Sequence, residues 1–257
     1  MTLFDIDSQY REKLAIWRVL STLPLYAPLA EGRVWRWFAI NIPMDLGTGA
    51  GGIYTSDLDI IARLSDYPQS KNWIYKTWEV KVSLLQENGA ARSLKAGKTK
   101  RTLTQLNAYK AFGAASTTLL DIYICEDGFL SNHDFPTEEV RQVSNHKISE
   151  IKLNGFGYQM LPFQHKKEGD KDVGLFVPSN IQRKTVVDIL HPNNFGHREP
   201  FSRLVEDLDK FFEQQGERPR KSFSQIVYCK NCKRLQLIDM KTVYDCPICS
   251  DDLVQQG

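Results

Sequence analysis

The stretch Trp78-Glu79-Val80-Lys81-Val82 is a short apolar run with one acid and one base set into it. Successive side chains of a strand point to opposite faces, so Glu79 and Lys81 share one face and Val80 and Val82 the other. Charged side chains are rare in otherwise apolar strands unless they pair or hold a metal ion. The stretch therefore predicts a strand with one face, that of Val80, in the core and the other, that of Glu79, at a functional site.

A second apolar run with inserted charges comes earlier, Ser56-Asp57-Leu58-Asp59-Ile60-Ile61-Ala62-Arg63. Asp57 and Asp59 are two residues apart and therefore share one face of the expected strand. Neighbouring carboxylates repel each other, and a divalent cation relieves that repulsion. Because such an ion can activate water and stabilise phosphate charge, the two strands predict a centre that cleaves phosphodiester bonds.

The order of the predicted elements indicates an α/β fold with a mixed central sheet flanked by helices. A glycine-rich turn at 47–52 and an exposed polar loop at 164–172 are expected between elements. A charged linker at 217–222 predicts two units, a domain of residues 1–216 and a small module of residues 223–257. The expected helices cover about 10–23, 102–115, 132–151 and 199–215, and the expected strands about 33–43, 56–63, 78–82 and 119–125.

Four of the five cysteines form two Cys-x-x-Cys pairs separated by thirteen residues: Cys229, Cys232, Cys246 and Cys249. This spacing predicts a tetrahedral four-thiolate Zn²⁺ site in a zinc-ribbon module. About 30 residues cannot build a stable core alone, so metal binding would supply folding energy. Because four thiolates leave no open coordination position, we expect a structural and not a catalytic zinc ion.

The net charge of +2 carries no information about partners, but the local charge does. Between residues 88 and 120 there are six basic residues and no acidic one, which favours a polyanionic partner close to the acidic strands. No apolar run approaches the length of a membrane span, and the first residues lack an export signal, so a cytoplasmic location is expected. The candidate nucleic-acid contacts are Arg92, Lys95, Lys98, Lys100 and Arg101.

These patterns resemble a known family. Asp59 in one apolar strand and Glu79-x-Lys81 in the next resemble the signature of the PD-(D/E)XK nuclease superfamily. Gln105-x-x-x-Tyr109 is similar to the helix motif of its RecB-type members, and at i and i+4 the two side chains share a helix face. The resemblance covers about residues 7–125. It implies a restriction-endonuclease-like core, with Gln105 and Tyr109 close to the metal site or the DNA backbone.

The expected activity is that of a Mg²⁺-dependent (or Mn²⁺-dependent) deoxyribonuclease in which metal-activated water attacks the phosphate in line. Asp59, Glu79 and the carbonyl of Val80 are the expected ligands, because Mg²⁺ prefers hard oxygen donors. Lys81, on the same strand face as Glu79, would orient the attacking water or offset developing phosphate charge.

The chain departs from the family pattern in two places. It has no Pro-Asp dipeptide, and Ser56-Asp57 stands where one would be sought. Either aspartate could be the ligand; we favour Asp59, because an apolar run follows it directly, and expect a supporting role for Asp57. Glu12 is the candidate for the glutamate that some members carry on the first helix, but its position favours a surface charge.

The expected partner is DNA. The resemblance also suggests a helicase, an ATPase or another subunit of a bacterial defence, restriction or recombination system. One core carries one centre and cuts one strand, so double-strand cleavage would need a homo-oligomer or a partner. Two alternatives stay open: a catalytically silent nuclease-fold scaffold that recruits partners through the zinc ribbon, and a nuclease directed at RNA.

Overall fold

The structure is a computed structural model that describes residues 16, 33–46, 57–65, 73–85, 97–126, 128–132, 135–168, 171–176, 187–190, 196–215, 224–239 and 246–250. Its elements in chain order are β1 (Val34–Pro43), β2 (Asp57–Ser65), β3 (Trp73–Leu85), α2 (Gly97–Ala111), β4 (Thr117–Cys125), α3 (Phe129–Asn132), α4 (Glu138–Leu153), β5 (Gly157–Glu168), β6 (Lys171–Phe176), β7 (Val187–Leu190), α5 (Phe201–Gln214), β8 (Ser224–Cys229) and β9 (Arg234–Asp239).

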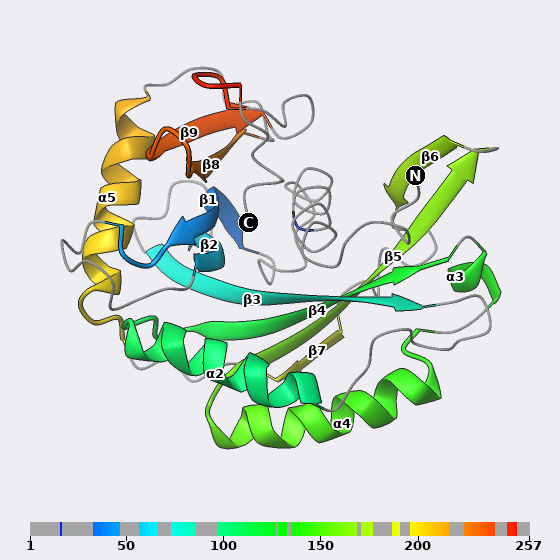
Figure 1. Ribbon diagram of the computed structural model, residues 1–257. Helices are drawn as coiled ribbons and strands as arrows, with labels where there is room; N and C mark the ends of the chain where they lie inside the picture. Colours follow the sequence, from blue (N-terminus) through cyan, green and yellow to red (C-terminus); the bar gives the residue numbers. More distant parts are fainter. Residues whose placement is uncertain are drawn as a thin grey trace.

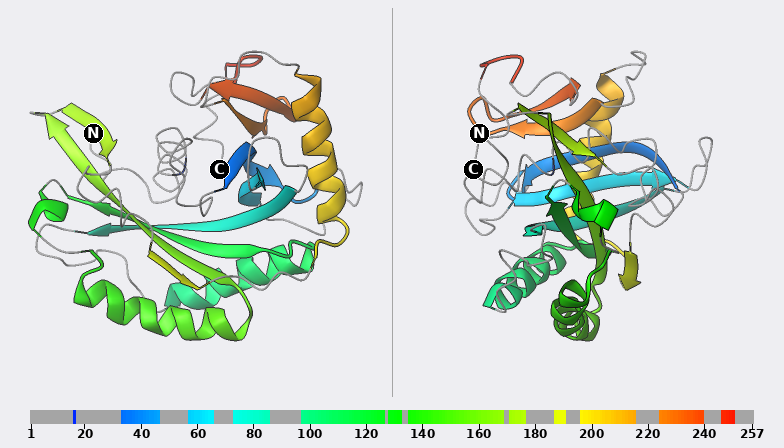
Figure 2. Two further views of the ribbon diagram at one scale, coloured as in Figure 1. Left: turned by 180° about the vertical axis from the view of Figure 1, so that it is seen from behind. Right: turned by 90° about the vertical axis from the view of Figure 1, so that its right-hand side faces the viewer.

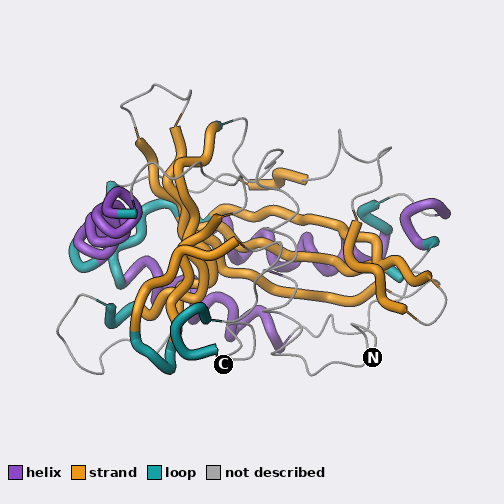
Figure 3. The backbone as a smooth tube through the Cα atoms, turned by 90° about the horizontal axis from the view of Figure 1, so that it is seen from above, coloured by secondary structure: helices purple, strands orange, loops and turns teal. Residues whose placement is uncertain are grey.

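The strands form one mixed sheet in the order β6-β5-β4-β3-β2-β1-β8-β9, with β7 paired to β5 (Figure 1). β1, β2 and β3 form an antiparallel meander, whereas β4 runs parallel to β3 and β5 runs parallel to β4. At the other side of the meander, β8 lies parallel to β1, and β9 pairs antiparallel with β8. The predicted α/β class with a mixed sheet is therefore confirmed, and Figure 3 shows the strands from above.

Helices cover two different parts of this sheet. α2 and α4 lie together along the β3–β4–β5 part, and α5 stands at the other end, beside β1, β8 and β9 (Figures 1 and 2). One core cluster contains Ile60, Trp78 and Val80. Two further clusters contain Tyr109 and Phe129, respectively. β8 contributes to the first two clusters, through Val227 and Ile226, and α5 packs in the second, whereas α4 packs in the third.

The central strand β4 is buried along its whole length, from Thr117 to Cys125. Helices can cover a parallel strand on both faces, so its sequence is nearly continuous in apolar residues and does not alternate. Leu120 and Ile122 pack in the cluster of β2 and β3, whereas Leu119 and Tyr123 pack against the helices. An acid within this strand, Asp121, is thus forced into the interior.

Asp209 attaches α5 to the meander. Its carboxylate accepts hydrogen bonds from Trp37 Nε1 at 2.7 Å and from Tyr75 Oη at 2.5 Å, and it pairs with Arg63 at 2.5 Å. The apolar face of the helix, which includes Phe201, is buried at the same time. These contacts attach α5 to all three strands of the meander, β1, β2 and β3.

One prediction about secondary structure is wrong. The polar stretch 164–172, expected as an exposed loop, is the hairpin of β5 and β6, in which Gln164 pairs with Phe176 and Glu168 with Lys171. Two strands satisfy each other's backbone groups whatever their side chains are, so a hairpin that projects from the sheet needs no apolar pattern (Figure 1). The short helix α3 was also not predicted, and α2 begins earlier and ends earlier than expected.

Several predicted features lie outside the described residues: the first helix apart from Ile16, Glu12, the glycine-rich turn and the linker at 217–222. The division into two domains stays a prediction, although β8 and β9 extend the same sheet as β1. Within the described residues, none of the helices has both the length and the apolar character needed to cross a bilayer.

Candidate functional site

The carboxylate of Asp59 lies where β2 and β3 separate. The ladder between these strands runs from Ser65–Trp73 to Ile60–Trp78, and Asp59 is the next residue of β2. Its Oδ2 accepts a hydrogen bond from the backbone N–H of Val80 at 2.7 Å. The Asp59 carboxylate thus accepts the hydrogen bond that a backbone carbonyl would accept in a regular ladder, from the peptide N–H between Glu79 and Val80.

β1 has an irregularity at the same level. Asn41, opposite Asp59 in the antiparallel register, has a φ of 53°, a left-handed conformation that asparagine tolerates better than most residues. Ile40 and Ile42 should share a face by alternation, yet they pack in different core clusters. β1 therefore changes face beside the site, which the sequence pattern did not predict.

Glu79 and Lys81 form a close ion pair on one face of β3. The Glu79 side chain is fully buried, and its Oε1 accepts from Lys81 Nζ at 2.5 Å. The same Nζ donates to the Val80 carbonyl oxygen at 3.0 Å. No donor among the described residues reaches Oε2 of Glu79, although this atom is buried. A buried carboxylate oxygen without a donor is costly, so this position favours a further cation or donor.

The Lys81 ammonium marks a point on which two oxygens converge. Glu79 Oε1 and the Val80 carbonyl are two of the three ligands expected from the sequence, and both contact Lys81 Nζ. The third, Asp59, is bound to the backbone N–H of the same residue, Val80. Carboxylate and carbonyl oxygens are the donors that Mg²⁺ prefers, so the type of donor fits such an ion.

Tyr109 of α2 supports the β2 side of this centre. Its hydroxyl donates to the backbone oxygen of Asp57 at 3.1 Å and accepts from the backbone N–H of Asp59 at 3.0 Å. Burial, followed by the charges of Asp59 and Glu79, raises the pKa of this fully buried phenol well above its usual value. Tyr109 is therefore a neutral side chain that fixes the backbone around Asp59.

Gln105 lies one helical turn before Tyr109. Its Oε1 is buried and has no donor among the described residues. The two residues share a helix face as predicted from their spacing. A direct contact of Gln105 with Asp59 or Glu79 stays a prediction.

Asp57 is oriented toward a different partner. Its carboxylate pairs with Lys230 Nζ at 2.7 Å, and both side chains are partly exposed. Among the described residues, Asp57 does not combine with Asp59 and Glu79 into one group of three converging carboxylates. The contact joins the beginning of β2 to the turn after β8, over a sequence distance that no pattern could predict.

Asp121 of β4 is a buried acid that sequence reasoning missed. In the parallel register it is the partner of Lys81, and its side chain is almost fully buried. Oδ2 accepts from Lys147 Nζ at 2.7 Å and from Tyr158 Oη at 2.6 Å, whereas Oδ1 has no donor among the described residues. An acid in the apolar run Leu119–Cys125 is the same signal that identified β2 and β3.

The predicted basic contacts are only partly described. Arg92 and Lys95 lie outside the described residues, and Lys98 is described in its backbone alone. Lys100 and Arg101 are exposed in the first turns of α2, which contains no acidic residue there. Cations at a helix N-terminus oppose the helix dipole, so an anion beside them would be favourable.

The four clustered cysteines come together at the end of β8. Their Sγ atoms lie within 4.8 Å of one another, and Cys229–Cys249 and Cys232–Cys246 are both 3.6 Å apart. Tetrahedral bonds of about 2.3 Å to a zinc ion separate thiolates by about 3.8 Å, whereas a disulfide needs about 2 Å. The four thiols are therefore close enough to hold one metal ion such as zinc.

The environments of these thiols differ. Burial raises the pKa of Cys229, but hydrogen bonds from the backbone and thiol of Cys232 and from the other thiols outweigh it and lower the pKa to about 7. The hydrogen bond with Cys229 is the largest cause that raises the pKa of Cys232. Cys229 and Cys246 are buried in the core cluster that contains Trp78 and Val80. The cysteine cluster therefore packs directly against the core cluster that includes the apolar side chains of β3.

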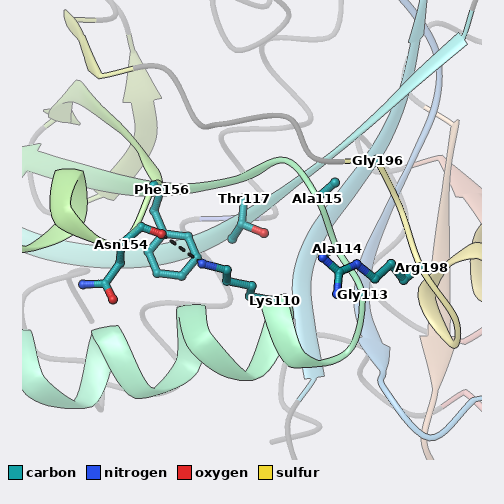
Figure 4. Close-up of a pocket in the computed structure, with 10 residues that line it drawn as sticks. Lys110, Gly113, Ala114, Ala115, Thr117, Asn154, Phe156, Gly196 and Arg198 are labelled. Atoms are coloured by element: carbon teal, nitrogen blue, oxygen red, sulfur yellow. Dashed lines mark hydrogen bonds between the residues drawn. The ribbon is translucent and has the colours of Figure 1, made fainter.

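A small cavity of about 90 Å³ lies between the ends of α2 and α4 and the segment around Arg198 (Figure 4). Lys110 lines it and donates to the Asn154 carbonyl at 3.3 Å. A side chain at Gly113 would come within 2.4 Å of the Arg198 oxygen, which explains the glycine at this close approach. None of the expected metal ligands lines this cavity.

Comparisons of the chain with protein-family models, curated proteins and solved structures find no match.

Proposed function

We propose that this protein is a metal-dependent deoxyribonuclease with a restriction-endonuclease-like core. The observation that carries the proposal is the arrangement around the backbone of Val80. Its N–H is bound by Asp59, and its carbonyl and the adjacent Glu79 carboxylate share one cation, the Lys81 ammonium. Three oxygen donors and a lysine are therefore gathered around one residue, where β2 and β3 separate.

The order of the elements supports the same function. The resembled family has its aspartate on the second core strand and Glu-x-Lys on the third. Here Asp59 is on β2, Glu79 and Lys81 are on β3, and Tyr109 is on the helix that crosses from β3 to the parallel strand β4. Tyr109 binds the backbone on either side of Leu58, so the helix motif lies against the acidic strand.

In this mechanism Asp59, Glu79 and the Val80 carbonyl would hold Mg²⁺ or Mn²⁺. A bound divalent ion supplies activation of water and neutralisation of phosphate charge. Glu79 would hold the ion through its carboxylate, and Lys81, which is about one-fifth exposed, would be within reach of the substrate. The Lys81 ammonium would donate hydrogen bonds to a non-bridging phosphate oxygen and orient the attacking water. Tyr109 would keep the β2 backbone around Asp59 in place.

Buried partners restrict what Lys81 can do in the resting protein. Its side chain is about one-fifth exposed, and it neutralises the fully buried Glu79. Leaving that carboxylate without a cation would be costly, so Lys81 would turn to a substrate phosphate only where another cation neutralises Glu79.

The direct test is cleavage of plasmid and linear DNA, with RNA in parallel, in Mg²⁺, Mn²⁺ or EDTA. We expect cleavage of DNA with either metal ion, none in EDTA, and loss of cleavage in Lys81→Ala. Lys210→Ala is the matched control because Lys210 is an exposed residue of α5. Mn²⁺ binding measured by calorimetry on the zinc-loaded protein provides a second readout.

Two outcomes would contradict the proposal and favour another function. Absence of both cleavage and Mn²⁺ binding would favour the silent scaffold, which recruits partners through the cysteine module. Cleavage of RNA but not of DNA would favour the RNA-directed nuclease. The proposed biological setting, a bacterial defence, restriction or recombination system with a helicase or ATPase partner, follows from the resemblance alone.

A further inference from the structure

The four-cysteine cluster lies close to the start of the strand that carries Asp59. We call the group of Asp59, Glu79 and Lys81 the carboxylate centre. β8 lies parallel to β1, with Ile226 and Val227 paired to Ala39 and Ile40, and it ends at Cys229. The next residue, Lys230, reaches the Asp57 carboxylate at 2.7 Å. The turn between β8 and β9 therefore lies beside the N-terminal end of β2, two residues before Asp59 (Figure 2).

This turn is basic and exposed. Lys230, Lys233 and Arg234 are all exposed, and residues 224–238 contain no acid. The backbone fixes their positions, because Lys233 has a φ of 51° and the flanking strands pair from Cys229–Arg234 onward. Cys229 and Cys246 bury the base of the turn in the core. Three cations are thus held on a rigid support.

A cationic surface beside the carboxylates would offset their repulsion of a phosphate backbone. The carboxylates of Asp57, Asp59 and Glu79 would repel a phosphodiester strand. Lys81 and Lys230 offset part of this charge by pairing with Glu79 and Asp57, respectively. Lys233 and Arg234 are exposed cations of the same turn as Lys230 and add further positive charge. The surface complements a polyanion.

We propose that Lys230, Lys233 and Arg234 form one wall of a DNA path, contact backbone phosphates next to the carboxylate centre, and are held there by a metal ion in the four-cysteine site. The inference rests on the proposed nuclease function and deepens it, because it gives the cysteine module a place in substrate binding. Lys230 exchanges its contact with Asp57 for one with a phosphate when DNA is bound.

The test is DNA binding without cleavage. Zinc-loaded protein is titrated into fluorescein-labelled DNA duplex in Ca²⁺ buffer, and the dissociation constant is measured by fluorescence anisotropy at several salt concentrations. Each lost phosphate contact reduces the slope of log K against log salt by about 0.7–0.9. We therefore expect Lys230→Ala to reduce the slope by roughly 1 and Lys233→Ala with Arg234→Ala by roughly 2.

The matched control is Lys152→Ala. Lys152 is an exposed lysine of α4, which lies at the opposite side of the molecule from β8 and β9 (Figure 1). Its replacement should leave the slope unchanged. The melting temperature of every variant is measured, so that a loss of binding is assigned to charge only where the fold is retained.

The metal-dependent part is tested with Cys249→Ser. We expect loss of bound zinc, measured by mass spectrometry, and a loss of slope of roughly 3, the sum expected for Lys230→Ala, Lys233→Ala and Arg234→Ala. If the serine variant does not fold, the slope of the parent protein before and after removal of its zinc by a chelator decides the metal-dependent part.

The outcomes distinguish this inference from the proposed function. Unchanged slopes in the charge variants would overturn it, even if the protein cleaves DNA. Reduced slopes in a protein that cleaves nothing would support the DNA path and reject the nuclease. Binding of single-stranded RNA, but not of DNA, with the same dependence on these residues would overturn the choice of DNA. A lower melting temperature with an unchanged slope would make Lys230 a structural contact alone.

Discussion

The carboxylate centre and the cysteine cluster differ in how the chain builds them. The first draws on β2, β3 and α2, from Asp57 to Tyr109, and long-range strand pairing brings these residues together. The second takes its four thiols from 21 consecutive residues and two tight turns. Donor type differs too, hard oxygen against soft sulfur, so under the proposed function the two sites would bind different metal ions.

Under the proposed function, this difference would separate the sites in stability as well as in role. The four thiols of the cysteine cluster surround one position, whereas the Glu79 carboxylate and the Val80 carbonyl both contact the ammonium of Lys81. Structural zinc sites have a closed shell of protein ligands, whereas catalytic sites keep an open position. Lys230 of the turn after β8 joins the two regions through Asp57, at the beginning of β2.

The largest effect is expected for Glu79→Gln. Loss of this buried charge would remove a proposed metal ligand and removes the charged partner of Lys81, so we expect the cleavage rate to fall by about 10³-fold. Zinc content should stay constant, which separates the two regions. Glu139→Gln, an exposed position on α4, is the control. Retained cleavage with lost zinc would reverse the roles assigned to the two sites.

The second largest effect is expected for Cys246→Ser. The thiol is buried in the core cluster of β2 and β3, and three remaining thiols bind a metal ion less tightly. We expect a loss of roughly 3 kcal/mol in the free energy of unfolding, a fraction of the ~10–16 kcal/mol that a structural zinc supplies to small modules. Urea unfolding with zinc in the buffer measures it. An unchanged stability would show that the cluster holds no structural metal.

The sequence predicted those features that depend on local spacing. Alternation placed Glu79 and Lys81 on one strand face, and the Cys-x-x-Cys pairs identified the thiol cluster. Spacing could not predict contacts between distant segments, such as Asp57 with Lys230.

Two other failures have physical causes. Hydrogen bonds between backbones, and not an apolar pattern, form the β5–β6 hairpin. Asn41 changes the face of β1 through a single dihedral angle, which alternation rules assume to be regular. Asp121 is a different case, because its signal was present in the sequence and was not used.

A smaller effect is expected for Tyr109→Phe. The hydroxyl binds one backbone oxygen and one backbone N–H of β2, and its loss leaves both groups buried without that partner. We expect a loss of about 1–3 kcal/mol in the free energy of unfolding. The cleavage rate should fall without a change in bound zinc. A variant as stable and as active as the parent protein would mean that α2 does not position Asp59.

The smallest effect near neutral pH concerns the buried phenols. Burial, followed by nearby carboxylates, raises the pKa of Tyr109 and of Tyr158 well above their usual value of 10. In the unfolded chain these phenols ionise near pH 10, whereas in the folded protein they stay protonated. The stability that they contribute is therefore fully present below pH 10 and is lost as the pH rises above it.

Each such phenol changes the free energy of unfolding by up to about 1.4 kcal/mol per pH unit above pH 10. Tyr109→Phe and Tyr158→Phe should each flatten this dependence, measured by urea unfolding between pH 9 and pH 11. Tyr228, on the strand that leads to the cysteine cluster, also has a pKa raised mainly by burial but is less buried, so Tyr228→Phe should flatten it less. Equal flattening by Tyr109→Phe and Tyr228→Phe would mean that the surroundings of Asp59 and Glu79 are no better shielded from water than those of the cysteine cluster, because burial is the largest cause of both pKa shifts.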